Sequence, residues 1–215
     1  ARSVPAKEVG GDYYDFFSFP SRDQTGLIIA DASGKGLPGT LYMTRSRSIF
    51  RVISSEEASP GKILSRSNHY IAADASSGKG MFITVLYALY DQKKKQMTCA
   101  NAGHYAPLWF KAKEKIFSEI KTNGIPVGIL PEQTYQEETV QLASQDLLVM
   151  YTDGVIEAKA EHGGMFGVER LKRLVEEHSS LNAQDLFAKI QAGIKEFTGQ
   201  APPFDDMTLM VIRVK

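Results

Sequence analysis

The order in which strand-like and helix-like segments follow one another constrains the fold of this chain most. Apolar segments near the N-terminus precede two adjacent predicted helices, Pro38–Ser54 and Ser59–Ala73. A run of strand-like segments then leads to two more adjacent helices, Val168–His178 and Asn182–Thr198, before a last strand at Met207–Val214. A doubly wound parallel sheet needs a strict alternation of strand and helix, which this order lacks. The order predicts an α+β fold in which helix pairs pack on the faces of antiparallel sheets.

Individual segments carry the signals of the elements that they are expected to form. Gly26–Ala30 is a short apolar run that predicts a buried strand, and Glu8–Phe19 predicts a bent strand or hairpin. In the first predicted helix we expect one stripe to face the core, comprising Leu41, Arg45, Ser48, Ile49, Val52 and Ile53. Later segments are rich in β-branched and aromatic residues and predict a β-meander that continues into further strands: Met81–Tyr90, Gln96–Ala102, Ala106–Lys111, Lys115–Ile120, Thr134–Leu142 and Asp146–Thr152.

Length and composition limit the class of protein. A chain of 215 residues with 43% hydrophobic and 23% charged residues suits one globular domain, so we expect residues 1–215 to form a single domain. The formal net charge is zero, which argues against binding to nucleic acid or to a membrane surface. The single cysteine, Cys99, excludes a disulfide framework and suits the reducing cytoplasm. The start at Ala1, without a targeting signal, favours a piece of a longer protein.

Acidic residues stand at one end of several apolar strand-like segments. They are Asp12, Asp31, Asp153 and the pair Asp205-Asp206. A carboxylate fixed against the end of a buried strand is unfavourable unless a cation, a cap or a turn compensates its charge. Turn chemistry explains any single case, such as Asp153-Gly154, but several such positions in one domain favour a shared cation site. Carboxylate oxygens suit hard ions such as Mg²⁺ or Mn²⁺.

Other chemistries have weaker signals. Gly34–Gly39 satisfies the G-x-G-x-x-G pattern of dinucleotide binding, but Pro38 lies inside the pattern and a second helix follows where a strand is expected. No arginine follows Cys99 at the spacing that a cysteine-dependent phosphatase requires, and Cys99 suits a small core residue. His104 lies in a glycine-bounded turn and suits either a site or, more often, a structural role.

Five motifs in the chain together resemble a known family. They are Glu8-Val-Gly-Gly-Asp-Tyr-Tyr-Asp-Phe-Phe, Ile29-Ala-Asp-Ala-Ser-Gly-Lys-Gly, Asn101-Ala-Gly-His-Tyr-Ala-Pro, Tyr151-Thr-Asp-Gly-Val-Ile-Glu-Ala and Phe204-Asp-Asp-Met-Thr. Each motif is weak alone, but their order and spacing closely resemble the metal-dependent (PPM-type) serine/threonine protein phosphatases. The likeness is to the bacterial sporulation and stress-response branch (SpoIIE/RsbU type), and it extends from about Val4 to Val214.

This resemblance implies a fold, an activity and a site. The fold is a four-layer α-β-β-α sandwich of two antiparallel sheets flanked by helix pairs. The activity is the hydrolysis of phosphoserine or phosphothreonine by direct attack of a hydroxide that bridges two Mn²⁺ or Mg²⁺ ions. The residues matched to the metal ligands, and hence to catalysis, are Asp12, Asp31, the Ala32 backbone carbonyl, Asp153 and Asp205. Asp31 bridges both ions, and Asp206 is the weaker choice of its pair.

Two positions depart from the pattern of the wider family. Lys7 and Glu8 stand in the region where eukaryotic members carry a phosphate-binding arginine. Ala32-Ser33 replace a glycine–histidine pair that follows the bridging aspartate. The phosphate-binding residue and the group that protonates the leaving alcohol are therefore unassigned.

The resemblance also implies partners. The domain is expected to be the C-terminal output domain of a longer regulator, controlled by an upstream sensor domain or an activator protein. Its expected substrate is a phosphorylated anti-sigma-factor antagonist of the STAS type, in sigma-factor regulation by partner switching. In relatives, the two helices after Asp31 act as a regulatory switch. The alternative is a non-catalytic partner-binding module on the same fold, which the retained carboxylates disfavour.

Overall fold

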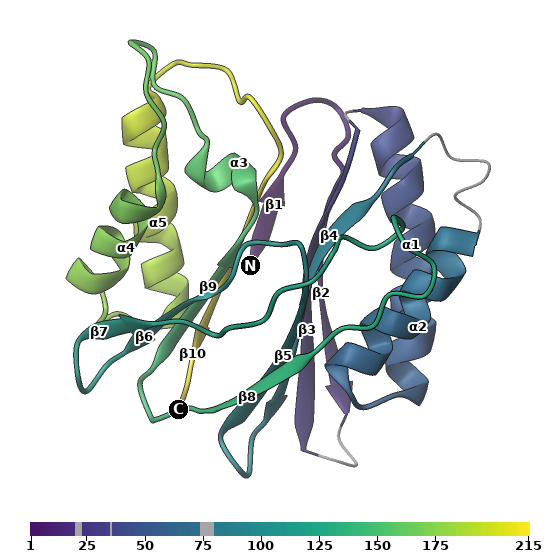
Figure 1. Cartoon of the computed structure of the whole chain (residues 1–215). Helices are drawn as coiled ribbons and strands as arrows, with labels where there is room; N and C mark the ends of the chain where they lie inside the picture. The colour runs from purple at the N-terminus through teal and green to yellow at the C-terminus, as the bar shows by residue number, and fades with distance from the viewer. Residues whose placement is uncertain (20–22, 35, 74–79) are drawn as a thin grey trace.

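Two β-sheets lie face to face, and helices cover the outer face of each (Figure 1). This computed structural model describes residues 1–19, 23–34, 36–73 and 80–215. Lys35, which belongs to the Gly34–Gly39 segment, lies outside the described residues. Over these ranges, no helix combines the length and the hydropathy that crossing a membrane requires.

Each sheet has five strands, and all pairings between the strands are antiparallel. The first sheet contains, in spatial order, β2 (Asp12–Phe19), β3 (Gln24–Ala32), β4 (Ile83–Asp91), β5 (Gln96–Ala102) and β8 (Glu137–Gln141). The second sheet contains, in spatial order, β1 (Arg2–Val4), β10 (Met207–Arg213), β9 (Leu147–Tyr151), β6 (Leu108–Lys111) and β7 (Ile116–Ser118).

The helices form the two outer layers. The first sheet is covered by α1 (Leu37–Glu56) and α2 (Pro60–Ala73), and the second by α4 (Val168–Glu177) and α5 (Ala183–Thr198). A short helix, α3 (Asp153–Ile156), follows β9. The predicted four-layer α-β-β-α sandwich is thus confirmed, and the predicted helix and strand segments match the observed ones to within a few residues.

Both faces of the central strands are buried, because each sheet lies between a helix layer and the other sheet. In β3, Ile28 belongs to the core beneath α1 and α2, whereas Leu27 and Ile29 belong to the core between the sheets. In β9, Val149 packs with α4 and α5, and Met150 packs between the sheets. The alternation of side chains along a strand therefore explains why these strands are continuous apolar runs in the sequence.

The predicted core stripe of α1 is confirmed only in part: Ile53 is buried and Ile49 packs against the core. Leu41 and Val52 are exposed, at 61% and 59% of their maximum accessible surface. The buried face is a neighbouring stripe with the same helical spacing, which includes Tyr42, Met43 and Phe50. Two aromatic side chains and a methionine offer this stripe the larger apolar area, and burial of that area favours it.

The predicted β-meander is wrong, because the chain changes sheets after β5. The β4–β5 and β6–β7 pairs are antiparallel hairpins, as expected, but β6 pairs with β9 in the second sheet. A turn after Asn101 diverts the chain: the Asn101 side chain accepts from the His104 N–H at 2.8 Å and donates to the His104 carbonyl at 2.9 Å. Gly103 adopts a positive φ of 72° in this turn, a conformation that favours glycine.

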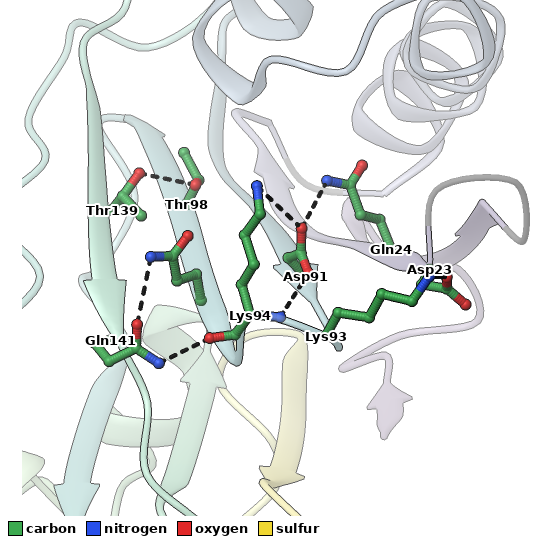
Figure 2. A network of polar contacts seen from close by, with 9 residues as sticks. Asp23, Gln24, Asp91, Lys93, Lys94, Thr98, Thr139 and Gln141 are labelled. Carbon is green, nitrogen blue, oxygen red and sulfur yellow. Dashed lines mark hydrogen bonds and ion pairs between the residues drawn. The ribbon is translucent and has the colours of Figure 1, made fainter.

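A network of polar contacts lies at the end of the first sheet that is remote from Asp31 (Figure 2). Asp91 accepts from the Lys94 backbone N–H at 2.9 Å and from Gln24 at 3.4 Å. Gln141 donates to the Lys94 carbonyl at 2.8 Å, which connects β8 to the β4–β5 turn. Because Gln24 and Asp31 lie near opposite ends of β3, this network is remote from the predicted site.

Asp146 fixes the start of β9 to β6. Its side chain is 1% exposed and accepts three hydrogen bonds, each of 3.0 Å, from Trp109 Nε1 and from the backbone N–H groups of Ala112 and Ala143. A buried carboxylate with this many donors is satisfied, and each donor depends on it in turn.

We expect Asp146→Ala to lower the free energy of unfolding by about 3 kcal/mol, since buried donors would be left without an acceptor. Urea denaturation followed by circular dichroism measures the change. The control is Glu169→Ala: Glu169 has a side chain 77% exposed and pairs with Lys172 at 3.0 Å, so its loss should cost less than about 1 kcal/mol. Equal losses in the two variants would contradict the assignment of Asp146.

Candidate functional site

The register of β2 and β3 places two of the predicted ligands side by side. Asp12 is the first residue of β2 and pairs with Asp31, next to the last residue of β3. The Asp12 carboxylate also accepts hydrogen bonds from the hydroxyls of Thr152 and Thr208, at 2.8 and 2.7 Å. Since Thr208 belongs to β10 and Thr152 follows β9, Asp12 lies where the ends of the two sheets meet.

Thr152 and Thr208 bind a candidate site residue, and the sequence reasoning missed them. Both are fully buried, and the Thr208 N–H donates to the Thr152 hydroxyl at 2.9 Å. Each threonine lies inside one of the five motifs, Thr152 directly before Asp153 and Thr208 three positions after Asp205, and this is the signal that could have drawn attention to them. Their hydroxyls fix the direction of the Asp12 carboxylate.

The electrostatic surroundings of Asp12 are unfavourable to a bare negative charge. Burial, reinforced by the Asp31 and Asp206 carboxylates, raises the pKa of Asp12 to about 8, although the Thr208 and Thr152 hydroxyls act in the opposite direction. A neighbouring cation would lower the pKa of a carboxyl group in this position, because a cation stabilises the charged form.

A cavity of about 180 Å³ opens beside this pair of aspartates. Asp31 and Ala32 line it from the end of β3, Asp205 and Asp206 line it from the segment before β10, and Lys7 brings a positive charge to its wall. Gly11 lies close to the Ala32 carbonyl: a Cβ on Gly11 would meet that oxygen at 3.1 Å. The structure thus brings Asp31, Ala32 and Asp205 together on one cavity, with Asp12 paired to Asp31.

Asp153 reaches the same region through α3. It is the first residue of this helix, and the next residue, Gly154, packs so closely on the segment before β10 that a Cβ would lie 2.0 Å from the Asp206 carbonyl oxygen. The residues that line the cavity include neither Asp12 nor Asp153. The α3 helix was not predicted, because Asp153-Gly154 suits a turn equally well.

The donor set suits a hard divalent ion, although the carboxylates are not gathered into a tight cluster. In the part of the chain that the structure describes, no group of three or more His, Cys, Asp or Glu side chains could already hold a metal ion. Aspartate carboxylates and a backbone carbonyl are nevertheless the ligands that Mg²⁺ and Mn²⁺ prefer. The half-buried Asp12, with its raised pKa beside a small acidic cavity, fits such an ion.

The other candidate residues have structural roles. His104 is buried with Nδ1 2.8 Å from the Thr84 hydroxyl, and burial lowers its pKa to about 4, so it is neutral at pH 7. Cys99 is fully buried, and this burial raises its thiol pKa to about 12. The Gly34–Gly39 segment follows a strand that is antiparallel to both neighbours, which differs from the parallel strands of a dinucleotide-binding fold.

Comparisons with known proteins agree with this fold and with the motifs. A family model described as Stage II sporulation protein E (SpoIIE) matches residues 21–215. The chain is 31% identical over 215 residues to the phosphoserine phosphatase RsbU of Bacillus subtilis (strain 168), and this match covers 100% of the chain and 62% of RsbU. The chain therefore spans less than two thirds of the length of that relative.

Solved structures share the fold at low sequence identity. The SiaA-PP2C domain of Pseudomonas aeruginosa has a TM-score of 0.88 at 21% identity, with 100% of this chain and 85% of that chain covered. RsbX, solved in complex with magnesium, has a TM-score of 0.74 at 14% identity, with 100% of this chain and 93% of that chain covered. Since the family model covers most of the residues, and the five motifs lie on this fold, the chain belongs to the Stage II sporulation protein E (SpoIIE) family.

Proposed function

We propose that this chain is a metal-dependent phosphatase domain that hydrolyses phosphoserine or phosphothreonine in a protein substrate. The observation that carries the proposal is one small cavity lined by Asp31, Ala32 and Asp205, with the half-buried Asp12 paired to Asp31. The name of RsbU, a phosphoserine phosphatase, supports the same activity.

Two Mg²⁺ or Mn²⁺ ions are the proposed cofactors. Asp12, Asp31, the Ala32 carbonyl and Asp205 would hold them together with Asp153. When bound, such ions supply an activated water and neutralise charge on the phosphoryl oxygens. The magnesium in the RsbX complex supports this choice of ion.

The proposed nucleophile is water, because the side chains that could attack phosphorus in its place are poorly suited to do so. Ser33 lines the cavity, but its hydroxyl accepts from the Phe82 N–H at 2.8 Å and so serves the backbone. Cys99 is fully buried with a raised thiol pKa, His104 is buried and neutral at pH 7, and neither residue lines the cavity. Direct attack of water on phosphorus therefore requires no covalent enzyme intermediate in this proposal.

The biological setting is proposed from the same family relationship. The substrate would be a phosphorylated anti-sigma-factor antagonist of the STAS type, and residues 1–215 would act as the C-terminal output domain of a cytoplasmic regulator. An upstream sensor domain or an activator protein would control it. The length of RsbU outside the matched region leaves space for such a domain in that relative.

We expect Asp31→Asn to reduce the Mn²⁺-dependent hydrolysis of a phosphoserine protein by at least about a hundredfold, because metal ions supply several kcal/mol of transition-state stabilisation. The assay compares initial rates after chelation and after readdition of Mn²⁺. Asp185→Asn, on the exposed first turn of α5, is the matched control and should retain full activity. Turnover without metal would refute the proposal, and metal binding without any turnover would favour the partner-binding module.

A second prediction concerns pH. The folded protein holds the Asp12 proton more tightly than the unfolded chain does, since the pKa is raised from the ordinary 3.8 to about 8. The contribution of Asp12 to the stability of the metal-free protein should therefore fall as pH rises through this window. Because the ion competes with that proton, Mn²⁺ affinity should rise by up to about tenfold per pH unit below pH 8.

Thermal melts and calorimetric Mn²⁺ titrations across this range measure both effects. Asp12→Asn is the control for the metal-free protein, because a neutral amide replaces the titrating group. As pH rises, the melting temperature of metal-free Asp12→Asn should increase relative to that of the metal-free wild type. A wild-type Mn²⁺ affinity that does not change with pH would contradict the prediction.

A further inference from the structure

Asp206 binds a segment that lies almost the whole chain away. Its Oδ1 accepts from the Ala6 backbone N–H at 2.7 Å, and its Oδ2 accepts from the Gly11 N–H at 2.7 Å. These partners precede it by 200 and 195 positions. Hydrogen bonds from N–H groups to an ionised carboxylate are stronger than those between neutral groups. Both oxygens of Asp206 therefore engage the connection between β1 and β2.

Two glycines make room for Asp206. A Cβ on Gly10 would lie 2.6 Å from the Asp206 Oδ2, and a Cβ on Gly154 would lie 2.0 Å from the Asp206 carbonyl oxygen. Even an alanine at either position would displace the neighbouring atoms. The backbone of the β1–β2 connection and that of α3 thus enclose Asp206 from two sides.

The contact with Gly11 bears directly on Asp12, the next residue. Besides donating its N–H to Asp206, Gly11 accepts at its carbonyl from the Ala32 N–H at 3.3 Å. Both backbone polar groups of Gly11 are therefore bonded, one to the segment before β10 and one to the end of β3. The path of the chain into Asp12 is set by these two bonds.

Asp205 has a different environment from its neighbour. Like Asp206, Asp205 lines the cavity with Asp31, but its Oδ1 accepts from the adjacent Asp206 N–H, at 3.0 Å, rather than from a distant segment. A carboxylate whose two oxygens each bind a backbone amide is poorly placed to bind an ion as well. Both aspartates line the cavity, but both carboxylate oxygens of Asp206 also bind backbone amides of the β1–β2 connection.

We propose that Asp206 is a positioning residue, which orients Asp12 for metal binding by fixing Gly11, and that Asp205 is the ligand of the pair. This inference rests on the proposed metal-dependent function. Residues that orient metal ligands typically change metal affinity by about 10- to 100-fold when they are substituted.

The first test compares two isosteric variants. In Asp206→Asn, one oxygen becomes an NH₂ group that faces a backbone N–H, so one of the two hydrogen bonds is lost. We expect the calorimetric Kd for Mn²⁺ to rise at least about tenfold, with kcat largely recovered at saturating Mn²⁺. Asp205→Asn should lose activity even at saturating Mn²⁺. Asp23→Asn, whose carboxylate pairs with Lys93, is the control and should bind Mn²⁺ like the wild type.

The second test needs no metal and no activity. Hydrogen exchange of the Ala6 and Gly11 amides should be slow in the metal-free wild type and faster in Asp206→Asn. Gly10→Ala should produce the same faster exchange, because the added methyl group displaces the carboxylate. Once Asp206→Ala has removed that carboxylate, adding Gly10→Ala should have little further effect, so the two substitutions should be non-additive.

An unchanged Kd and unchanged amide exchange in Asp206→Asn would overturn the inference. So would a loss of activity that no Mn²⁺ concentration restores while the two amides stay protected, since Asp206 would then act as a ligand. If the wild type binds Mn²⁺ but hydrolyses no phosphoprotein, the proposed function fails, and the Kd and exchange measurements still decide the role of Asp206.

Discussion

The hydrogen bonds from Thr152 and Thr208 to Asp12 are the contact on which the arrangement of the site depends. They join the first sheet to the second at the end where the cavity opens. They also hold the half-buried Asp12 carboxylate where partial removal from water raises its pKa. The protein therefore keeps, at the junction of its layers, a group that destabilises the metal-free fold when charged. Such a loss of stability is expected at a position where ligand binding, rather than fold stability, determines which residue is present.

Most of the secondary structure and much of the site could be predicted from the sequence, because their signals are local. The apolar run before Asp31 and the Asn182 cap of α5 are read from a few neighbouring residues, and the structure contains both. The positions of Asp31 and Asp205 at the ends of apolar segments likewise predicted a shared acidic site, and both line the same cavity. Their roles as metal ligands stay predictions.

The rest depended on contacts between distant segments. Two stripes of α1 have helical spacing, and packing against the first sheet decides that Phe50 is buried and Val52 exposed. The assignment of β6 to the second sheet follows from its pairing with β9, which no local pattern encodes. The hydrogen bonds from Thr152 and Thr208 to Asp12 also join distant segments, since Asp12 lies 140 and 196 positions before them.

The pairing of β1 with β10 has a consequence for the order of folding. Arg2 pairs with Leu209, and Asp206 binds Ala6 across 200 positions, so a segment near the start of the chain and the segment before β10 lie together beside the cavity. Closing so long a loop costs entropy before any contact offsets it. During synthesis, Asp12 leaves the ribosome long before Thr208 exists. Within residues 1–215, β10 is therefore made after the other strands, and a nascent chain that stops short of it lacks the Thr208 hydroxyl that binds Asp12.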